Sequence, residues 1–158
     1  ADGNPGAANA FRAAGWRLGA AVLVLDYLKA FLPVLVAHYG FQFPDEQLIW
    51  VALMPTLGHA FSIFLRFRGG RAIVVMFGVW SGLTLYVVPV VIGVTAVAAV
   101  LLFRSDVLRT LVIPVVLVVY LVVQSAPPWM IGLAASQLLV FVVKIGAARL
   151  MPAPPHAA

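Results

Sequence analysis

The length of its apolar runs limits the possible folds of this 158-residue chain more than any other feature. Residues 72–103 and 107–123 contain almost no charged side chains, and their hydrophobic residues are not confined to one helical face. Over the whole chain 64% of residues are hydrophobic and 9% are charged, whereas soluble domains carry about 25% charged residues. This composition leaves too little polar surface for a water-soluble globule. We therefore expect an all-α, polytopic membrane helix bundle.

Six apolar segments approach the roughly 20 residues that a helix needs to cross the hydrocarbon core of a bilayer. They predict six transmembrane helices within residues 16–149 of a single membrane domain, residues 1–158. The predicted spans are Trp16–His38, Gln47–Phe67, Ala72–Val87, Val88–Phe103, Val107–Val123 and Pro128–Arg149. The third and fourth divide one long run at Tyr86–Pro89, because proline disfavours helix in the residue before it. Residues 1–15 are expected to form a cytoplasmic glycine-rich loop, and residues 150–158 a cytoplasmic Pro/Ala tail.

The basic residues predict the orientation of these spans. Those on alternate connections are Arg12, Arg17, Arg66, Arg68, Arg71, Arg104, Arg109, Lys144 and Arg149. The other connections contain no Lys or Arg, and cytoplasmic loops of membrane proteins carry the excess of basic residues. We therefore expect the basic connections to be cytoplasmic. This also accounts for the net charge of +5 without a nucleic-acid partner.

Three ionisable side chains fall inside the predicted spans. Asp26 and Lys29 lie three residues apart, so they share a helix face and can pair. His59 reaches a similar depth in the second span, where a contact with Asp26 is plausible. Ionisable groups at such depth are costly and often functional, but a self-neutralised structural pair and an interhelical hydrogen bond remain the alternatives. We expect Asp26 and Lys29 to support a site, and His59 to orient a loop or a neighbour.

Two glycine-rich segments, residues 3–12 and 67–71, immediately precede predicted spans on the basic face. Glycine leaves backbone N–H groups open to an anion, and the following helix adds the positive end of its dipole. Each segment ends in an arginine, whereas Arg17 and Arg109 fit better as lipid-headgroup anchors. The pattern predicts a phosphate site at this face.

The same segments carry a family resemblance. Gly3-Asn4-Pro5-Gly6-Ala7 with Asn9 and Arg12, then Asp26-Tyr27-Leu28-Lys29, and then Gly58-His59 through Gly69-Gly70-Arg71 follow one another in a distinctive order. They resemble the motifs GSGNxGxTNxxR, DxxKG and GHxxPxxxxFxGGKGxAT of bacterial acyl-phosphate-dependent glycerol-3-phosphate acyltransferases, the PlsY type. That family has seven membrane helices. Six spans are what we expect when the helix ahead of the first motif is missing.

The resemblance implies a membrane acyltransferase of the bacterial inner membrane, with its active site facing the cytoplasm. Its reaction transfers an acyl chain from acyl phosphate to glycerol 3-phosphate, giving lysophosphatidate and phosphate in phospholipid synthesis. The expected partners are acyl phosphate, glycerol 3-phosphate and membrane lipids, with no cofactor and no metal. Positions implied to bind phosphate are Gly3, Asn4, Gly6, Asn9, Arg12, Gly69, Gly70, Arg71 and Ser105, and the candidate catalytic residues are Arg12, Arg71 and His59.

Several positions depart from the family pattern. Asp2 replaces the serine of the first motif, and Arg71 replaces the lysine of the second. The family's last motif, near HxxNxxRL, survives only as Arg149-Leu150, with Val143 and Gly146 in its His and Asn positions. A catalytically degenerate homologue that binds acyl phosphate or phospholipid is therefore the alternative function. A small anion transporter is a third, although the sequence shows no internal repeats.

Overall fold

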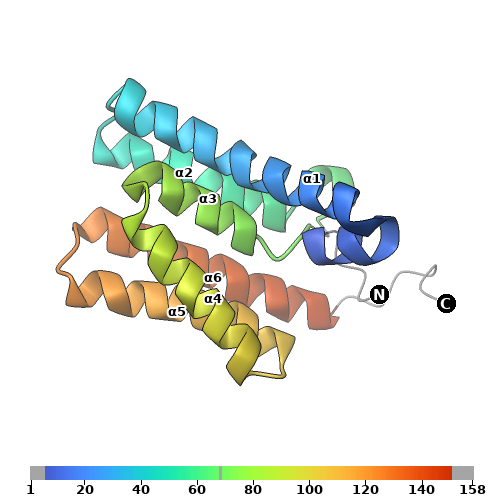
Figure 1. The fold of residues 1–158 in the computed structure, drawn as a ribbon. Helices are drawn as coiled ribbons and strands as arrows, with labels where there is room; N and C mark the ends of the chain where they lie inside the picture. The colour runs from blue at the N-terminus through green and yellow to red at the C-terminus, as the bar shows by residue number, and fades with distance from the viewer. Residues whose placement is uncertain (1–5, 68, 151–158) are drawn as a thin grey trace.

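The computed structural model describes residues 6–67 and 69–150, which form a bundle of α-helices joined by short connections (Figure 1). The helices are α1 (Ala7–Leu35), α2 (Asp45–Ala60), α3 (Ile73–Thr84), α4 (Val87–Leu102), α5 (Asp106–Val123) and α6 (Pro128–Leu150). A π-helical turn, Val36–Gly40, continues α1, and a 3₁₀ turn, Ile63–Leu65, follows α2. Successive helices run in alternate directions along the bundle. The predicted all-α membrane bundle is confirmed.

Helix length separates four segments from the other two. Four segments are long and apolar enough to cross a membrane: Asn9–Gly40, Asp45–Leu65, Asp106–Val123 and Pro128–Ala147. Helices α3 and α4 have 12 and 16 residues, which at 1.5 Å per residue makes them about 18 and 24 Å long. The hydrocarbon core is about 30 Å thick. Six full-length spans are therefore not established, although all six predicted helices are present.

The first helix begins earlier than predicted. Residues 7–14 are helical rather than a loop, and a kink at Gly15, with φ 77° and ψ 179°, separates them from the long segment that starts at Trp16. A positive φ is accessible to glycine at little steric cost. The kink folds residues 7–14 back, so that a Cβ on Gly19 would overlap the ring of Phe11.

Two further boundaries differ from the prediction. Helix α2 ends at Ala60 rather than at Phe67, because Phe61 leaves helical geometry, with φ −121° and ψ 49°. The chain then turns through left-handed backbone at Arg66 and Phe67. The long apolar run divides at Leu85, where φ is 57°, one residue ahead of the predicted break. Pro89 lies in the first turn of α4, where its missing N–H has no intrahelical partner to lose.

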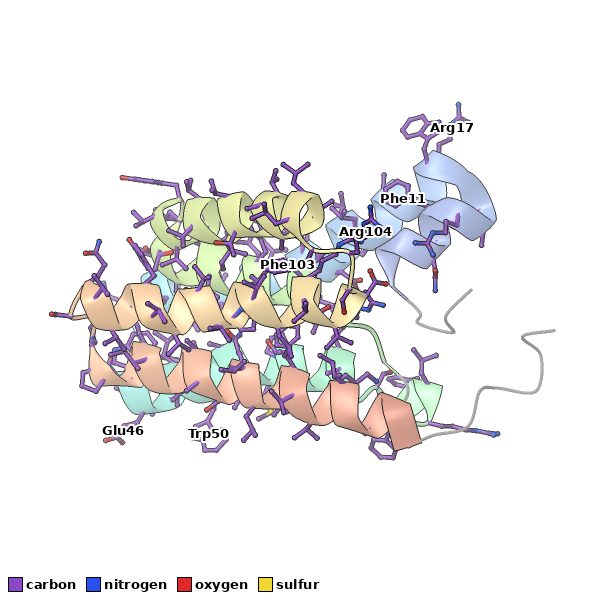
Figure 2. All side chains as sticks on the ribbon, turned by 90° about the horizontal axis from the view of Figure 1, so that it is seen from below. Phe11, Arg17, Glu46, Trp50, Phe103 and Arg104 are labelled. Carbon is purple, nitrogen blue, oxygen red and sulfur yellow. The ribbon has the colours of Figure 1, made fainter. Side chains whose placement is uncertain are left out.

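The basic connections and the acidic connection lie at opposite ends of the bundle. In Figure 2, Phe11, Arg17 and Arg104 lie toward one end, and Glu46 and Trp50 toward the other. We call the first the basic end; α1, α3 and α5 start there, and α2, α4 and α6 finish there.

Glycines on α3 allow it to pack closely on α1. A Cβ on Gly78 would lie 2.5 Å from the carbonyl oxygen of Tyr27, and one on Gly82 would lie 3.0 Å from that of Phe31. Small residues spaced four apart let membrane helices bring their backbones together. This packing fixes the face of α1 that carries Asp26 and Lys29 relative to the rest of the bundle.

A buried hydrogen-bonded chain joins three helices. The indole Nε1 of Trp80 on α3 donates to Gln137 Oε1 on α6 over 2.8 Å, and Gln137 Nε2 donates to Thr56 Oγ1 on α2 over 3.1 Å. All three residues are fully buried. Paired in this way, the polar atoms avoid the penalty of burial without a partner.

Replacing Gly78 by alanine is expected to destabilise the fold by about 1–3 kcal/mol, the usual cost of overpacking, because the backbone of α1 cannot move aside. The melting temperature in detergent measures this effect. Gly132→Ala on α6 is the matched control, since a Cβ there meets nothing within 4 Å. Equal melting temperatures for the two variants would contradict the close α1–α3 packing.

Candidate functional site

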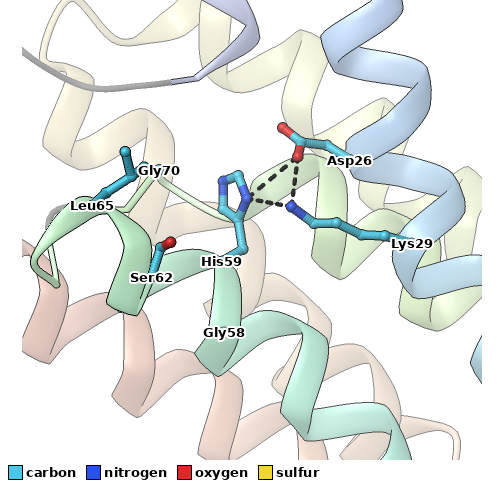
Figure 3. A pocket seen from close by; sticks show the side chains of 7 residues that line it. All are labelled: Asp26, Lys29, Gly58, His59, Ser62, Leu65 and Gly70. Carbon is cyan, nitrogen blue, oxygen red and sulfur yellow. Dashed lines mark hydrogen bonds and ion pairs between the residues drawn. The ribbon is translucent and has the colours of Figure 1, made fainter.

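A polar cavity opens at the basic end, between α1, α2 and the connection that leads to α3 (Figure 3). Its volume is about 190 Å³. The lining residues are Asp26, Lys29, Gly58, His59, Ser62, Leu65 and Gly70. Four of these, Asp26, Lys29, His59 and Gly70, were predicted site or supporting residues, and the fold brings them together from three segments of the chain.

Asp26, Lys29 and His59 form one hydrogen-bonded cluster. Lys29 Nζ donates to Asp26 Oδ1 over 2.6 Å and lies 2.7 Å from His59 Nδ1. His59 Nδ1 also lies 3.4 Å from Asp26 Oδ1. The predicted Asp26–Lys29 pair and the Asp26–His59 contact across the two helices are both confirmed. The ammonium group of Lys29 is the centre of the cluster, which the sequence did not indicate.

These distances indicate which ring nitrogen of His59 carries the proton. An ammonium group can only donate hydrogen bonds, so Nδ1, at 2.7 Å from Lys29 Nζ, acts as the acceptor. The same nitrogen cannot also donate to Asp26, and the longer 3.4 Å separation agrees with that. The ring proton is therefore assigned to Nε2, the nitrogen next to Gly70.

Gly69 and Gly70 pack against the end of α2. Both residues are buried, and the Gly70 N–H donates to the carbonyl oxygen of His59 over 3.1 Å. A Cβ on Gly69 would overlap the carbonyl oxygens of His59 and Ala60, and one on Gly70 would overlap His59 Nε2. The absence of a side chain is thus required by packing. That these glycines bind an anion stays a prediction.

Arg71 is held near the start of α5. Its Nη2 donates to Asp106 Oδ2 over 3.1 Å, while Nη1 of Arg109 donates to Asp106 Oδ1 over 3.2 Å. Arg109 Nε also donates to the carbonyl oxygen of Phe103, 2.7 Å away, at the end of α4. The prediction that Arg109 anchors a lipid headgroup therefore did not include its contacts with Asp106 and Phe103. Ser105, the predicted phosphate ligand beside them, is the exposed N-cap residue of α5.

The first glycine-rich segment makes its own contacts on α1. Arg12 Nη1 donates to Asn9 Oδ1 over 3.2 Å, and Gly6 is the N-cap residue of the helix. Gly3 and Asn4 lie outside the described residues. Arg12 and Asn9 therefore lie on a short helix at the basic end, rather than in the predicted loop, and their phosphate contacts stay a prediction.

The altered last motif lies on the outer face of α6. Val143 is 49% exposed and Gly146 is also exposed. Between them, Lys144 turns toward the α2–α3 connection, with Nζ 3.4 Å from the carbonyl oxygen of Phe67 and 5.6 Å from the ring centroid of Phe61. Neither Val143 nor Gly146 lines the cavity.

Four residues near the site were not predicted as part of it: Ser62, Leu65, Asp106 and Arg109. Ser62 and Leu65 line the cavity three and six residues after His59. They lie in a turn, where the sequence predicted that the helix continues. The acidic residue at the start of α5, between two basic ones, was a usable signal for Asp106. Within residues 6–67 and 69–150, no group of three His, Cys, Asp or Glu side chains is arranged to hold a metal ion.

Replacing Gly70 by alanine is expected to displace the His59 ring, because the added methyl group overlaps Nε2. Nitrogen-15 NMR of labelled histidines reports this as a shift of the His59 signal, which in the parent protein should show protonation at Nε2. Gly58→Ala is the control: Gly58 lines the same cavity, yet a Cβ there meets nothing within 4 Å. An unchanged signal in the Gly70 variant would refute the contact.

A family model described as glycerol-3-phosphate acyltransferase matches residues 1–151. Glycerol-3-phosphate acyltransferase 1 of Thermotoga maritima is 46% identical over 93 residues, which cover 58% of this chain and 46% of that protein. The glycerol-3-phosphate acyltransferase of Mesorhizobium japonicum is 34% identical over 140 residues, 89% of this chain and 70% of the relative. The chain thus spans less than half the length of the first relative.

Two solved structures have the same fold. The crystal structure of PlsY, an integral membrane glycerol 3-phosphate acyltransferase in its glycerol 3-phosphate form, superposes with a TM-score of 0.82 and 26% identity. The match covers 95% of this chain and 76% of that one. The lysophosphatidic acid form of the same enzyme gives a TM-score of 0.81 over 93% of this chain.

Proposed function

The chain belongs to the glycerol-3-phosphate acyltransferase family, and from this premise we propose that it transfers an acyl chain to glycerol 3-phosphate at a membrane surface. We further propose acyl phosphate as the donor and the first hydroxyl of glycerol 3-phosphate as the acceptor. The products are then lysophosphatidate, which stays in the membrane, and phosphate. The observation that carries the proposal is a cavity at the basic end, lined by the ammonium group of Lys29, the imidazole ring of His59 and Gly70, the residue before Arg71.

The proposed reaction needs little covalent chemistry from the protein. The acceptor hydroxyl oxygen attacks the acyl carbonyl carbon and forms the new ester C–O bond. The mixed anhydride C–O bond breaks, and the departing phosphate takes up the hydroxyl proton. Both substrates are phosphorylated, so binding and aligning two anions would supply most of the acceleration. The basic end offers Lys29 on α1 and Arg71 ahead of α3 for this purpose. Both are linked to His59 of α2, Lys29 through its ammonium group and the Arg71 segment through Gly70.

His59 fits the role of an orienting group better than that of a general base. Its Nδ1 already accepts a hydrogen bond from Lys29, and its Nε2 holds the ring proton, so neither nitrogen is free to take a proton from a hydroxyl group. Its carbonyl oxygen receives the Gly70 N–H. His59 thus connects the cation at Lys29 to the segment that carries Arg71.

Arg71→Gln is expected to lower kcat/KM for glycerol 3-phosphate about a hundredfold, the usual loss when one donor to a developing anion is removed. Product formation from acyl phosphate and radiolabelled glycerol 3-phosphate measures this in lipid nanodiscs. Arg17→Gln is the matched control, because it removes the same charge at the same end from a side chain that stacks on Trp16. Equal losses in both variants would contradict a specific role for Arg71.

Other outcomes of the same assay separate the alternatives. Turnover with acyl-CoA but not with acyl phosphate would identify a different donor. Binding of acyl phosphate without product would support a catalytically degenerate homologue. The pairing of Arg71 with Asp106 favours that second candidate, because it neutralises part of the charge offered to the substrate.

We also propose that the basic end faces the cytoplasm of a bacterial inner membrane, since basic residues are retained on that side. The chain contains no cysteine, so single cysteines report accessibility without a background. In intact cells, Glu46→Cys should react with a membrane-impermeant maleimide, and Arg104→Cys should react only after the cells are opened. The reverse labelling pattern would invert the orientation.

A further inference from the structure

Asp106 lies between two arginines from different elements. Its Oδ2 accepts from Arg71 Nη2 over 3.1 Å, and its Oδ1 accepts from Arg109 Nη1 over 3.2 Å. Each carboxylate oxygen therefore serves a separate guanidinium. One anionic group bridges the segment before α3 to the first turns of α5.

Arg109 is fixed by contacts other than the carboxylate. Its Nε donates to the carbonyl oxygen of Phe103 over 2.7 Å, and its Nη2 lies 3.4 Å from the carbonyl oxygen of Val100, both at the end of α4. These backbone contacts hold the guanidinium in place, so it keeps presenting Nη1 to the space that the Asp106 carboxylate occupies. Arg109 is therefore a preformed half of an anion site.

The two ion pairs are accessible to solvent. The Asp106 side chain is 54% exposed, and those of Arg71 and Arg109 are 38% and 34% exposed. Exposed ion pairs hold their partners weakly. A phosphate group is a stronger competitor, since it carries more charge than a carboxylate and can also bridge two guanidiniums.

We propose that Arg71 and Arg109 form a phosphate subsite whose resident counter-anion is Asp106. A phosphomonoester dianion enters by displacing the carboxylate from both guanidiniums. Because the carboxylate competes for both guanidiniums, Asp106 limits how tightly an anion binds at this subsite. The inference rests on the proposed function, because the ligand of this subsite is one of the two phosphorylated substrates.

Binding of inorganic phosphate to the protein in nanodiscs, followed by calorimetry at fixed ionic strength, tests this without turnover. Asp106→Asn and Asp106→Ser are expected to lower the dissociation constant about two- to fivefold, the range expected for one exposed charge pair. Asp45→Asn is the control, because Asp45 also opens a helix, α2, but lies at the opposite end of the bundle. The control should leave phosphate binding unchanged.

The outcomes separate this inference from the proposed function. Tighter binding in both Asp106 variants, lost again when Arg71→Gln is added, supports the subsite, and misfolding cannot produce a gain of this kind. Unchanged or weaker binding in the Asp106 variants overturns the inference, while the proposed function stands if Arg71→Gln alone weakens phosphate binding. If Arg71→Gln alone has no effect on phosphate binding, the subsite and the proposed role of Arg71 both fail.

Discussion

The structure depends on the absence of water within a bilayer, which forces polar side chains in the spans to find partners inside the protein. Lys29 meets this requirement through Asp26 and His59, and Gln137 meets it through Trp80 and Thr56. Among the described residues, no buried side-chain nitrogen or oxygen lacks a partner. The first cluster ties α1 to α2, and the second ties α2, α3 and α6. Hydrogen bonds between polar residues thus connect helices whose other contacts are hydrophobic.

Glycine sets how closely the elements around the cavity approach one another. Gly78 and Gly82 bring α3 against the backbone of α1, while Gly69 and Gly70 bring the next segment against the end of α2. A methyl group at Gly69, Gly78 or Gly82 would meet backbone atoms that cannot easily move, and one at Gly70 would meet the His59 ring. A reading of Gly69–Gly70 as an anion-binding loop alone misses this, because both glycines are buried and both are needed to place Arg71.

The sequence was sufficient for the membrane bundle and for the Asp26–Lys29 and Asp26–His59 contacts, because helix periodicity and rise fix which residues share a face and a depth. It was insufficient where the backbone leaves regular geometry. The kink at Gly15 and the non-helical backbone at Phe61 changed two boundaries, since such conformations depend on tertiary contacts. The Asp106–Arg71 contact was missed for a similar reason, because it joins residues 35 positions apart in the chain.

The departures from the family pattern are distributed unevenly over the structure. Val143 and Gly146 lie on the outer face of α6, and Arg71 pairs with the half-exposed Asp106. Asp26, Lys29 and His59, which satisfy one another at depth, match the family motifs. A change at an exposed position costs little, because water or a headgroup can solvate the new side chain. Losing one member of the deep cluster would strand an ammonium group or a carboxylate. The departures at residues 71, 143 and 146 thus lie where a substitution costs less than it would in the deep cluster.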